Sequence, residues 1–250
     1  MRRILVAGNW KMHGSQAMVE ELLEGLLAGV DNGTKVDMAV FPPYPFLAQT
    51  RSMLKNSPIS WGGQTLNPVA QGAHTGEISA SMLLDFGCRY VLVGHSERRA
   101  IYGESDEDVA DRFEAALAAG MSPVLCIGET LEQRESGETE AVVERQLDAV
   151  LARCGIGAFR NAIVAYEPVW AIGTGKTASP DQAQEVHTFI RDKLVAQDDI
   201  IAGQLRILYG GSVNGSNAAD LFARDDIDGG LVGGASLKVE DFLAIYNAVA

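Results

Sequence analysis

The sequence predicts an α/β fold: a (β/α)8 barrel of eight parallel strands with an outer ring of helices, forming one domain over residues 1–250. Two observations predict it. Short apolar runs, often β-branched, alternate with longer segments of helical periodicity, and this happens eight times along the chain. Several runs are apolar throughout, as in strands that are buried on both faces of a parallel sheet.

The eight apolar runs are the expected strands. Polar residues or glycine pairs follow most of them, where the carboxyl ends of barrel strands would meet. The runs cover residues 4–7, 36–41, 59–62, 90–93, 124–127, 162–166, 206–209 and 230–232.

Segments of helical periodicity fill the intervals, and each places its apolar residues on one stripe. Ser179, Pro180 and Gln182 predict a helix start, because they suit the N-cap, the first helical position and the end of a capping box. The other expected helices include residues 18–27, 106–119, 141–151 and 239–249.

An open doubly wound sheet is the rival arrangement for this alternation. Eight strand–helix units in 250 residues favour the barrel, and the absence of a linker or composition shift favours one domain. The loop from Gln64 to Ser79 is unusually long and rich in Gly, Thr and Asn. Long ordered loops are typical of functional or interface elements.

The charge excludes some classes of partner. With 20 Lys and Arg against 33 Asp and Glu, the net charge is −13. A protein that binds nucleic acid or an anionic membrane would show a basic patch, so neither partner is expected. A small anionic substrate in a local positive pocket remains open, because net charge does not describe one site.

Cysteine usage predicts a cytoplasmic protein. Cys88, Cys126 and Cys154 cannot all pair, and none forms a Cys-x-x-Cys motif. We expect buried thiols in a reducing compartment, with no catalytic role for Cys126. No run reaches the ~18 apolar residues of a membrane span.

Chemically useful side chains follow three of the strands: Asn9 and Lys11, then His95, then Glu167. A surface lysine, a core histidine and a buried salt bridge are their structural alternatives. His95 precedes an expected short helix over 96–101, and a helix N-terminus disfavours imidazolium. A carboxylate such as Glu167 at the end of a buried strand needs a partner or a role.

The remaining histidines, His13, His74 and His187, show no metal-binding spacing, so no metal is expected. The charged run Glu-Arg-Arg at 97–99 indicates a structural ion-pair network.

The segment at 173–178, which contains two glycines, resembles nucleotide-binding motifs only in part. A Walker A motif fails because Trp170 stands where a glycine is needed. A dinucleotide fingerprint must turn directly out of the strand, whereas residues 168–172 intervene. We therefore expect a mobile lid with Pro168 at one end, and no cofactor.

Glycine pairs follow the seventh and eighth strands, at Gly210-Gly211-Ser212 and at Gly233-Gly234. Either pair alone is consistent with a tight turn. Together they predict a phosphate site, because missing side chains expose backbone N–H groups and these two loops bind phosphate in such barrels.

These segments resemble the triose-phosphate isomerase family over the whole length of the chain, so the fold is expected to be its TIM barrel. The motifs stand in the family's order at barrel spacing: Asn-Trp-Lys at 9–11, Gly-Ala-His-Thr-Gly-Glu at 72–77, Gly-His-Ser-Glu-Arg-Arg at 94–99, Ala-Tyr-Glu-Pro-Val-Trp-Ala-Ile-Gly-Thr-Gly-Lys-Thr-Ala at 165–178, Tyr-Gly-Gly-Ser-Val at 209–213 and Leu-Val-Gly-Gly-Ala-Ser-Leu at 231–237.

The resemblance implies cofactor-free interconversion of dihydroxyacetone phosphate and D-glyceraldehyde 3-phosphate through an enediolate. It implies Glu167 as the base, His95 as a neutral electrophile and Lys11 as an electrostatic stabiliser. Asn9 would help to place Lys11 and the substrate. The phosphate would be held by backbone groups at Gly173, Ser212, Gly233 and Gly234.

The resemblance also implies a homodimer in which the Gln64–Ser79 loop, with Thr75 near its tip, enters the partner's site. Two residues depart from the family pattern: His74 replaces a usual aromatic residue, and Thr65 replaces a frequent Asn. Both leave the strength and pH dependence of the interface open.

Three other functions are alternatives to the isomerase. A Schiff-base aldolase needs a lysine in an apolar pocket on a late strand, unlike Lys11. A retaining glycosidase needs two carboxylates about 5 Å apart, with Glu97 and Glu167 as the only pair. A non-catalytic phosphate-binding barrel would keep Ser212 and Gly233 but tolerate loss of Glu167.

Overall fold

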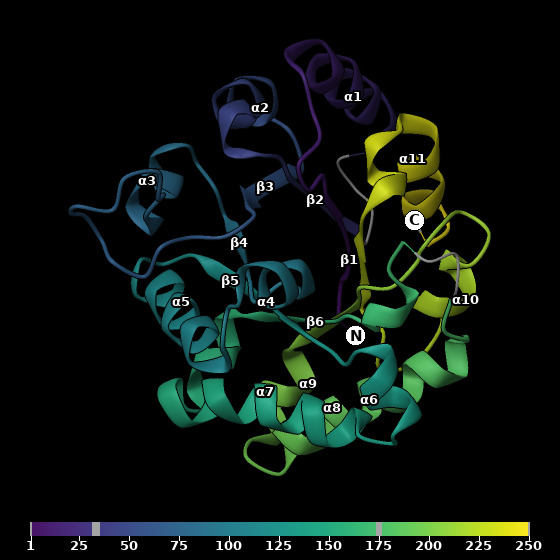
Figure 1. Ribbon diagram of the computed structural model, residues 1–250. Helices are drawn as coiled ribbons and strands as arrows, with labels where there is room; N and C mark the ends of the chain where they lie inside the picture. Colours follow the sequence, from purple (N-terminus) through teal and green to yellow (C-terminus); the bar gives the residue numbers. More distant parts are fainter. Residues whose placement is uncertain (1, 32–35, 174–176, 250) are drawn as a thin grey trace.

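The computed structural model describes residues 2–31, 36–173 and 177–249. Its eight strands pair in parallel and in chain order, and β1 pairs with β8 to close the barrel (Figure 1). This arrangement confirms the predicted fold and excludes the open sheet. The strands are β1 Ile4–Asn9, β2 Val36–Phe41, β3 Ile59–Gly63, β4 Tyr90–Val93, β5 Ser122–Ile127, β6 Ile163–Tyr166, β7 Arg206–Tyr209 and β8 Gly229–Val232.

Helices surround the barrel in Figure 1. Six helices lie where the sequence predicts them, to within a few residues at each predicted boundary. They are α1 Gln16–Gly29, α4 Ser96–Tyr102, α5 Asp106–Ala118, α7 Thr139–Cys154, α8 Pro180–Val195 and α11 Val239–Asn247. The predicted start of α8 is confirmed, since the Ser179 side chain accepts from the N–H of Gln182 in a reciprocal capping box.

Several short helices were not predicted, because five to eight residues carry too little periodicity to stand out. They are α2 Leu47–Leu54, α3 Ala80–Asp85, α6 Leu131–Glu135, α9 Asp199–Gln204 and α10 Ala218–Phe222. Four 3-10 turns also occur among the described residues: η1 Tyr44–Phe46, η2 Ile156–Asn161, η3 Val169–Ala171 and η4 Gly234–Leu237.

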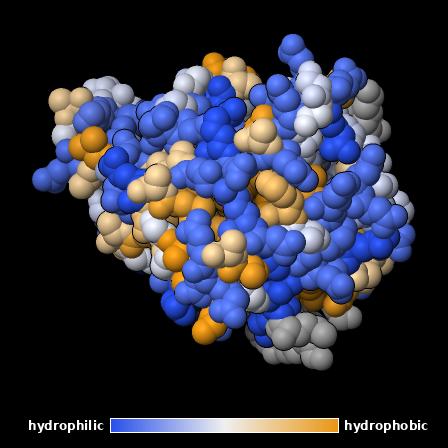
Figure 2. All heavy atoms as spheres, turned by 90° about the horizontal axis from the view of Figure 1, so that it is seen from below, coloured by the Kyte–Doolittle hydropathy of each residue, from blue (hydrophilic) through white to orange (hydrophobic). Residues whose placement is uncertain are grey.

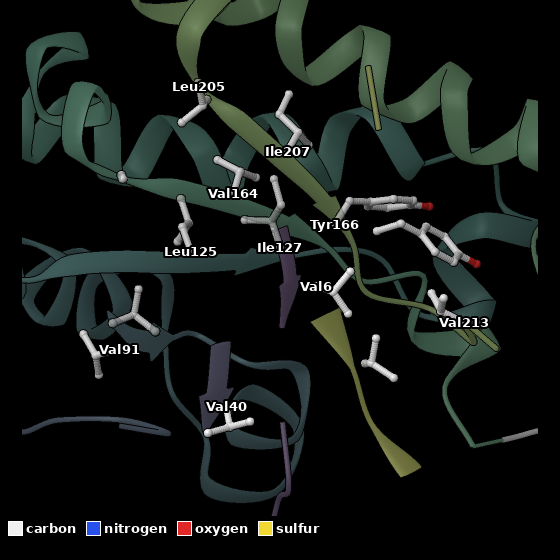
Figure 3. Close-up of a cluster of buried hydrophobic side chains, with 14 of the residues drawn as sticks. Val6, Val40, Val91, Leu125, Ile127, Val164, Tyr166, Leu205, Ile207 and Val213 are labelled. Atoms are coloured by element: carbon white, nitrogen blue, oxygen red, sulfur yellow. The ribbon is translucent and has the colours of Figure 1, made fainter. Parts of the chain in front are cut away.

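The apolar core forms two layers. One fills the barrel interior with side chains such as Leu92, Val124 and Leu208. The other lies between the strands and the helix ring, where Val6, Leu125 and Ile207 project outward (Figure 3). Hydrophilic side chains cover most of the face seen in Figure 2. Because strands buried on both sides are held rigidly, the loops at their carboxyl ends have a fixed platform.

Candidate active site

A cavity of about 350 Å³ opens at the carboxyl ends of the strands. Every site residue expected from the sequence lines it: Asn9, Lys11, His95, Glu167, Gly173, Ser212, Gly233 and Gly234. They come from the ends of β1, β4 and β6 and from the loops that follow β6, β7 and β8. Barrel closure therefore brings into one cavity residues that are far apart in the sequence.

His95 and Glu167 face each other as a buried pair. The distance from His95 Nε2 to Glu167 Oε1 is 2.9 Å, and both residues are buried. The other carboxylate oxygen, Oε2, accepts from the backbone N–H of Ser96 at 2.8 Å. The carboxylate that ends β6 thus has the partners that its burial demands.

The hydrogen bonds around His95 select one tautomer. His95 is the N-cap of α4, and its Nδ1 accepts from the backbone N–H of Glu97 at 3.2 Å. A nitrogen that accepts carries no proton, so the proton of the neutral ring is on Nε2, which faces Glu167. An imidazolium would lose the bond from Glu97 and would point a second N–H at the positive end of a helix.

The two pKa values depend on this contact. Burial raises the pKa of Glu167. His95, the N–H of Ser96 and the charge of Lys11 together lower this pKa by more than burial raises it, so the net shift is downward. Burial lowers the pKa of His95, whereas Glu167 raises it, and the net direction is upward. Both shifts describe one pair, and the upward shift of His95 requires the carboxylate to stay beside the ring.

Lys11 reaches the cavity from a strained backbone. Its φ is +52°, in the left-handed region that non-glycine residues rarely adopt. Its N–H donates to Asn9 Oδ1 at 3.0 Å, and its Nζ lies 2.5 Å from Glu97 Oε1. A Cβ placed on Gly233 would be 3.6 Å from the Lys11 Cε, so the lysine side chain lies beside one of the expected phosphate glycines.

The charged run at 97–99 forms the expected ion-pair network. Glu97 pairs with Lys11, and Arg99 pairs with Asp106 at 2.6 Å. Arg98 pairs with Glu104 at 2.5 Å. The arginines act structurally here, whereas Glu97 contacts a site residue.

Glycines keep the rim of the cavity clear. A Cβ on Gly210 would lie 2.8 Å from the Glu167 Cγ, so only glycine leaves room for the carboxylate there. A Cβ on Gly234 would meet nothing within 4 Å, which leaves its backbone open to the cavity. Gly234 begins the 3-10 turn η4.

Polar groups that follow β5 and β6 lie behind the site. Glu129 is fully buried and accepts from Trp170 Nε1 at 2.9 Å and from Tyr166 Oη at 3.1 Å. The sequence alone does not assign Glu129 a role. The predicted lid, with Pro168 at one end, includes residues 174–176, which lie outside the described residues.

Within residues 2–31, 36–173 and 177–249, no group of three His, Cys, Asp or Glu side chains could hold a metal ion. No helix in those ranges has the length and apolar character of a membrane span. The cavity lining also includes His13, Ile172 and Asn214, which the sequence did not single out.

Comparison with known proteins places the chain among relatives of one kind. The family model described as triosephosphate isomerase matches residues 4–249. The triosephosphate isomerase of Dechloromonas aromatica (strain RCB) is 60% identical over 248 residues, which is 99% of each chain. That of Thiobacillus denitrificans (strain ATCC 25259 / T1) is 58% identical over 250 residues, which is all of both chains. The chain belongs to the triosephosphate isomerase family.

Proposed function

We propose that this protein is a single-domain catalytic barrel, residues 1–250, that interconverts dihydroxyacetone phosphate and D-glyceraldehyde 3-phosphate. The observation that carries the proposal is the buried His95–Glu167 pair, which lies in one cavity with Lys11 and the open glycine backbones. A carboxylate and a neutral hydrogen-bond donor at one carbonyl are what proton abstraction beside that carbonyl needs. No cofactor enters the scheme.

Glu167 is the proposed base. Its lowered pKa keeps it ionised near neutral pH, and burial removes water that would weaken it. In the described conformation its oxygens accept from His95 and Ser96. When the substrate carbonyl oxygen takes the Nε2–H of His95, the carboxylate loses that partner and can take a proton from carbon.

His95 and Lys11 are the proposed stabilisers of the enediolate. The Nε2–H of His95 donates to the oxygen on which charge develops, and the Lys11 ammonium adds a positive charge from the other side. Asn9 holds the N–H of Lys11 at 3.0 Å. These roles, a carboxylate as base and a neutral histidine as hydrogen-bond donor, are those known for the family.

Backbone groups at Gly173, Ser212, Gly233 and Gly234 are the proposed phosphate holders. All four line the cavity, and Gly233 lies beside Lys11. The proposed lid, with Pro168 at one end, would exclude water and so protect an enediolate that can otherwise eliminate phosphate.

A homodimer through the Gln64–Ser79 loop is part of the proposal. Every residue from 68 to 77 is exposed, and this stretch extends outward beside α3 in Figure 1. Met12, Ile101 and Tyr102 are also exposed, by 92%, 69% and 67%, which a lone protomer would leave in water. His74 and Thr65 stay the residues whose effect on this interface is open. A cytoplasmic location is proposed with it.

The rival functions fit less well. An aldolase needs an unprotonated lysine, whereas Lys11 is ion-paired with Glu97. A glycosidase would need Glu97 as a second free carboxylate, and the same pair engages it.

A coupled assay with D-glyceraldehyde 3-phosphate tests the proposal, with Glu167→Gln as the matched variant of nearly equal shape. The wild type should turn over, and the variant should lose at least about 10²-fold in kcat. An inactive wild-type protein, or a variant with near-normal turnover, contradicts it. A non-catalytic phosphate-binding barrel would give the first of these results.

A further inference from the structure

Gln64 is the first residue after β3, and its side chain joins two other parts of the barrel mouth. Its Nε2 donates to the carbonyl oxygen of Lys11 at 2.8 Å and to that of Phe41 at 2.8 Å. Phe41 ends β2, and Lys11 follows β1. One amide group therefore ties together the carboxyl ends of three neighbouring strands.

The carbonyl that Gln64 binds belongs to a strained residue. In the described ranges, Lys11 is the one non-glycine residue with positive φ. Such a conformation persists only where its surroundings hold it. The surroundings here act on both sides of the residue, because Asn9 Oδ1 accepts its N–H and Gln64 donates to its C=O.

The backbone of Lys11 decides where the ammonium lies. With φ at +52°, the side chain runs past Gly233 and ends 2.5 Å from Glu97 Oε1. Relaxation to the ordinary negative φ would turn the Cα–Cβ bond and carry Nζ away from both. The position of the charge in the cavity thus depends on bonds made by the main chain.

Gln64 is itself held on a firm base. The hydroxyl of Tyr44 donates to the carbonyl of Thr65 at 2.6 Å. Arg112 donates to the carbonyl of Leu66, and the N–H of Asn67 donates to that of Ile78 at 2.7 Å. These bonds fix the two stems of the 64–79 loop against η1, α5 and each other.

We propose that Gln64 is a positioning residue that holds the strained backbone of Lys11 and so places its ammonium at the substrate. Because Gln64 opens the 64–79 loop, the same bond makes the lysine position depend on how that loop is seated. The inference rests on the proposed role of Lys11 and extends it to a residue that does not itself line the cavity.

The first test replaces Gln64 by Leu, which has similar size and no donor. Gln49→Leu is the matched control, because Gln49 Nε2 also donates to a main-chain carbonyl, that of Gln16 at 2.9 Å, on helices outside the cavity. Since a 1 Å misplacement can cost about 10²-fold, kcat/KM of Gln64→Leu should fall at least about 10-fold. Gln49→Leu should stay within about 2-fold of wild type. Sedimentation at the assay concentration checks that all three share one oligomeric state.

The second test asks whether Gln64 acts through Lys11. Dissociation constants for inorganic phosphate are measured for wild type, Gln64→Leu, Lys11→Met and the double variant, with no need for turnover. If Gln64 acts through Lys11, its loss weakens phosphate binding in wild type but has no further effect once Lys11 is Met. Additive losses indicate a merely structural role.

The outcomes separate the two proposals. An inactive wild type contradicts the proposed function, whereas the phosphate cycle still reports on Gln64. Equal kcat/KM for Gln64→Leu and Gln49→Leu, or additive losses in the cycle, overturn the inference. If Gln64→Leu does not fold, Gln64→Asn replaces it, because the shorter side chain keeps the amide but withdraws it from the Lys11 carbonyl. Its loss of kcat/KM and of phosphate affinity should be smaller than that of Gln64→Leu, and the loss of phosphate affinity should again be non-additive with Lys11→Met.

Discussion

His187 on α8 is a fully buried imidazole whose environment opposes a positive charge. Its Nδ1–H donates to the carbonyl of Asp226 at 3.0 Å, and its ring stands edge-on to Tyr166 with 5.8 Å between ring centroids. Tyr209 packs on it at 6.4 Å. Burial lowers its pKa to about 4; the Asp226 carbonyl opposes that shift, Arg191 adds to it and the Asp226 charge opposes it.

This shift makes folding stability depend on pH. The ordinary value is 6.5, so below that pH the unfolded chain takes a proton on His187 that the native state refuses until about pH 4. The unfolded state binds more protons in this window, and stability therefore falls as the pH falls from 6.5 toward 4. The difference between the ordinary pKa of 6.5 and a pKa of about 4 is worth about 3 kcal/mol, of which about 2 kcal/mol is lost between pH 7 and pH 5.

His187→Asn tests the reasoning, because the Asn amide overlays Nδ1 and can still donate to Asp226. Urea unfolding at pH 7 and pH 5, at one fixed protein concentration, gives the loss of unfolding free energy for each protein. The variant should lose about 2 kcal/mol less than wild type over this range, although its smaller side chain lowers stability at both values. His13→Asn removes an exposed imidazole and is the control. Equal losses in wild type and His187→Asn would refute the argument.

Two further expectations follow from the geometry. Gly128→Ala would put a Cβ 1.8 Å from the carbonyl oxygen of Glu167. The free energy of unfolding should therefore fall by at least about 2 kcal/mol, and kcat should fall as well. An unchanged melting temperature would contradict this. Ile101→Lys places a charge on the exposed apolar face, so sedimentation should show monomer at concentrations where wild type is dimeric. A wild type that is fully active as a monomer at nanomolar concentration would remove the proposed dimer instead.

The barrel could be predicted from the sequence because most of its strands, such as β4 and β6, are buried on both faces. The mainly apolar runs at 36–41 and 90–93 are recognisable as strands without a polar–apolar alternation. Their predicted bounds are the same as those of β2 and β4 in the structure. The start of α8 was also predictable, since Ser179, Pro180 and Gln182 form a helix N-terminus through contacts with residues next to them in the sequence. Position after a strand then gave the site residues, because the barrel converts that position into a common face.

The contacts inside the site could not be predicted in this way. Glu167 accepts from the N–H of Ser96, 71 positions earlier in the chain, and pairs with the neighbouring His95, and only barrel closure brings these residues together. The tautomer of His95 depends on a hydrogen bond from the backbone N–H of Glu97, and the identity of a residue does not predict a bond made by its main chain. Gln64 was predicted only as the start of a long loop, and its two carbonyl partners are brought to it by the folded main chain.

The net charge of −13 and a site for an anion are compatible only if the local field does not depend on the Lys11 ammonium alone. Lys11 already pairs with Glu97, whose side chain is 42% exposed, so the ammonium alone leaves little uncompensated charge. A phosphate dianion must therefore share Lys11 with Glu97 and take most of its hydrogen bonds from backbone N–H groups at the glycine loops. Backbone dipoles carry no net charge, and this lets the remainder of the surface stay strongly acidic while the cavity attracts an anion.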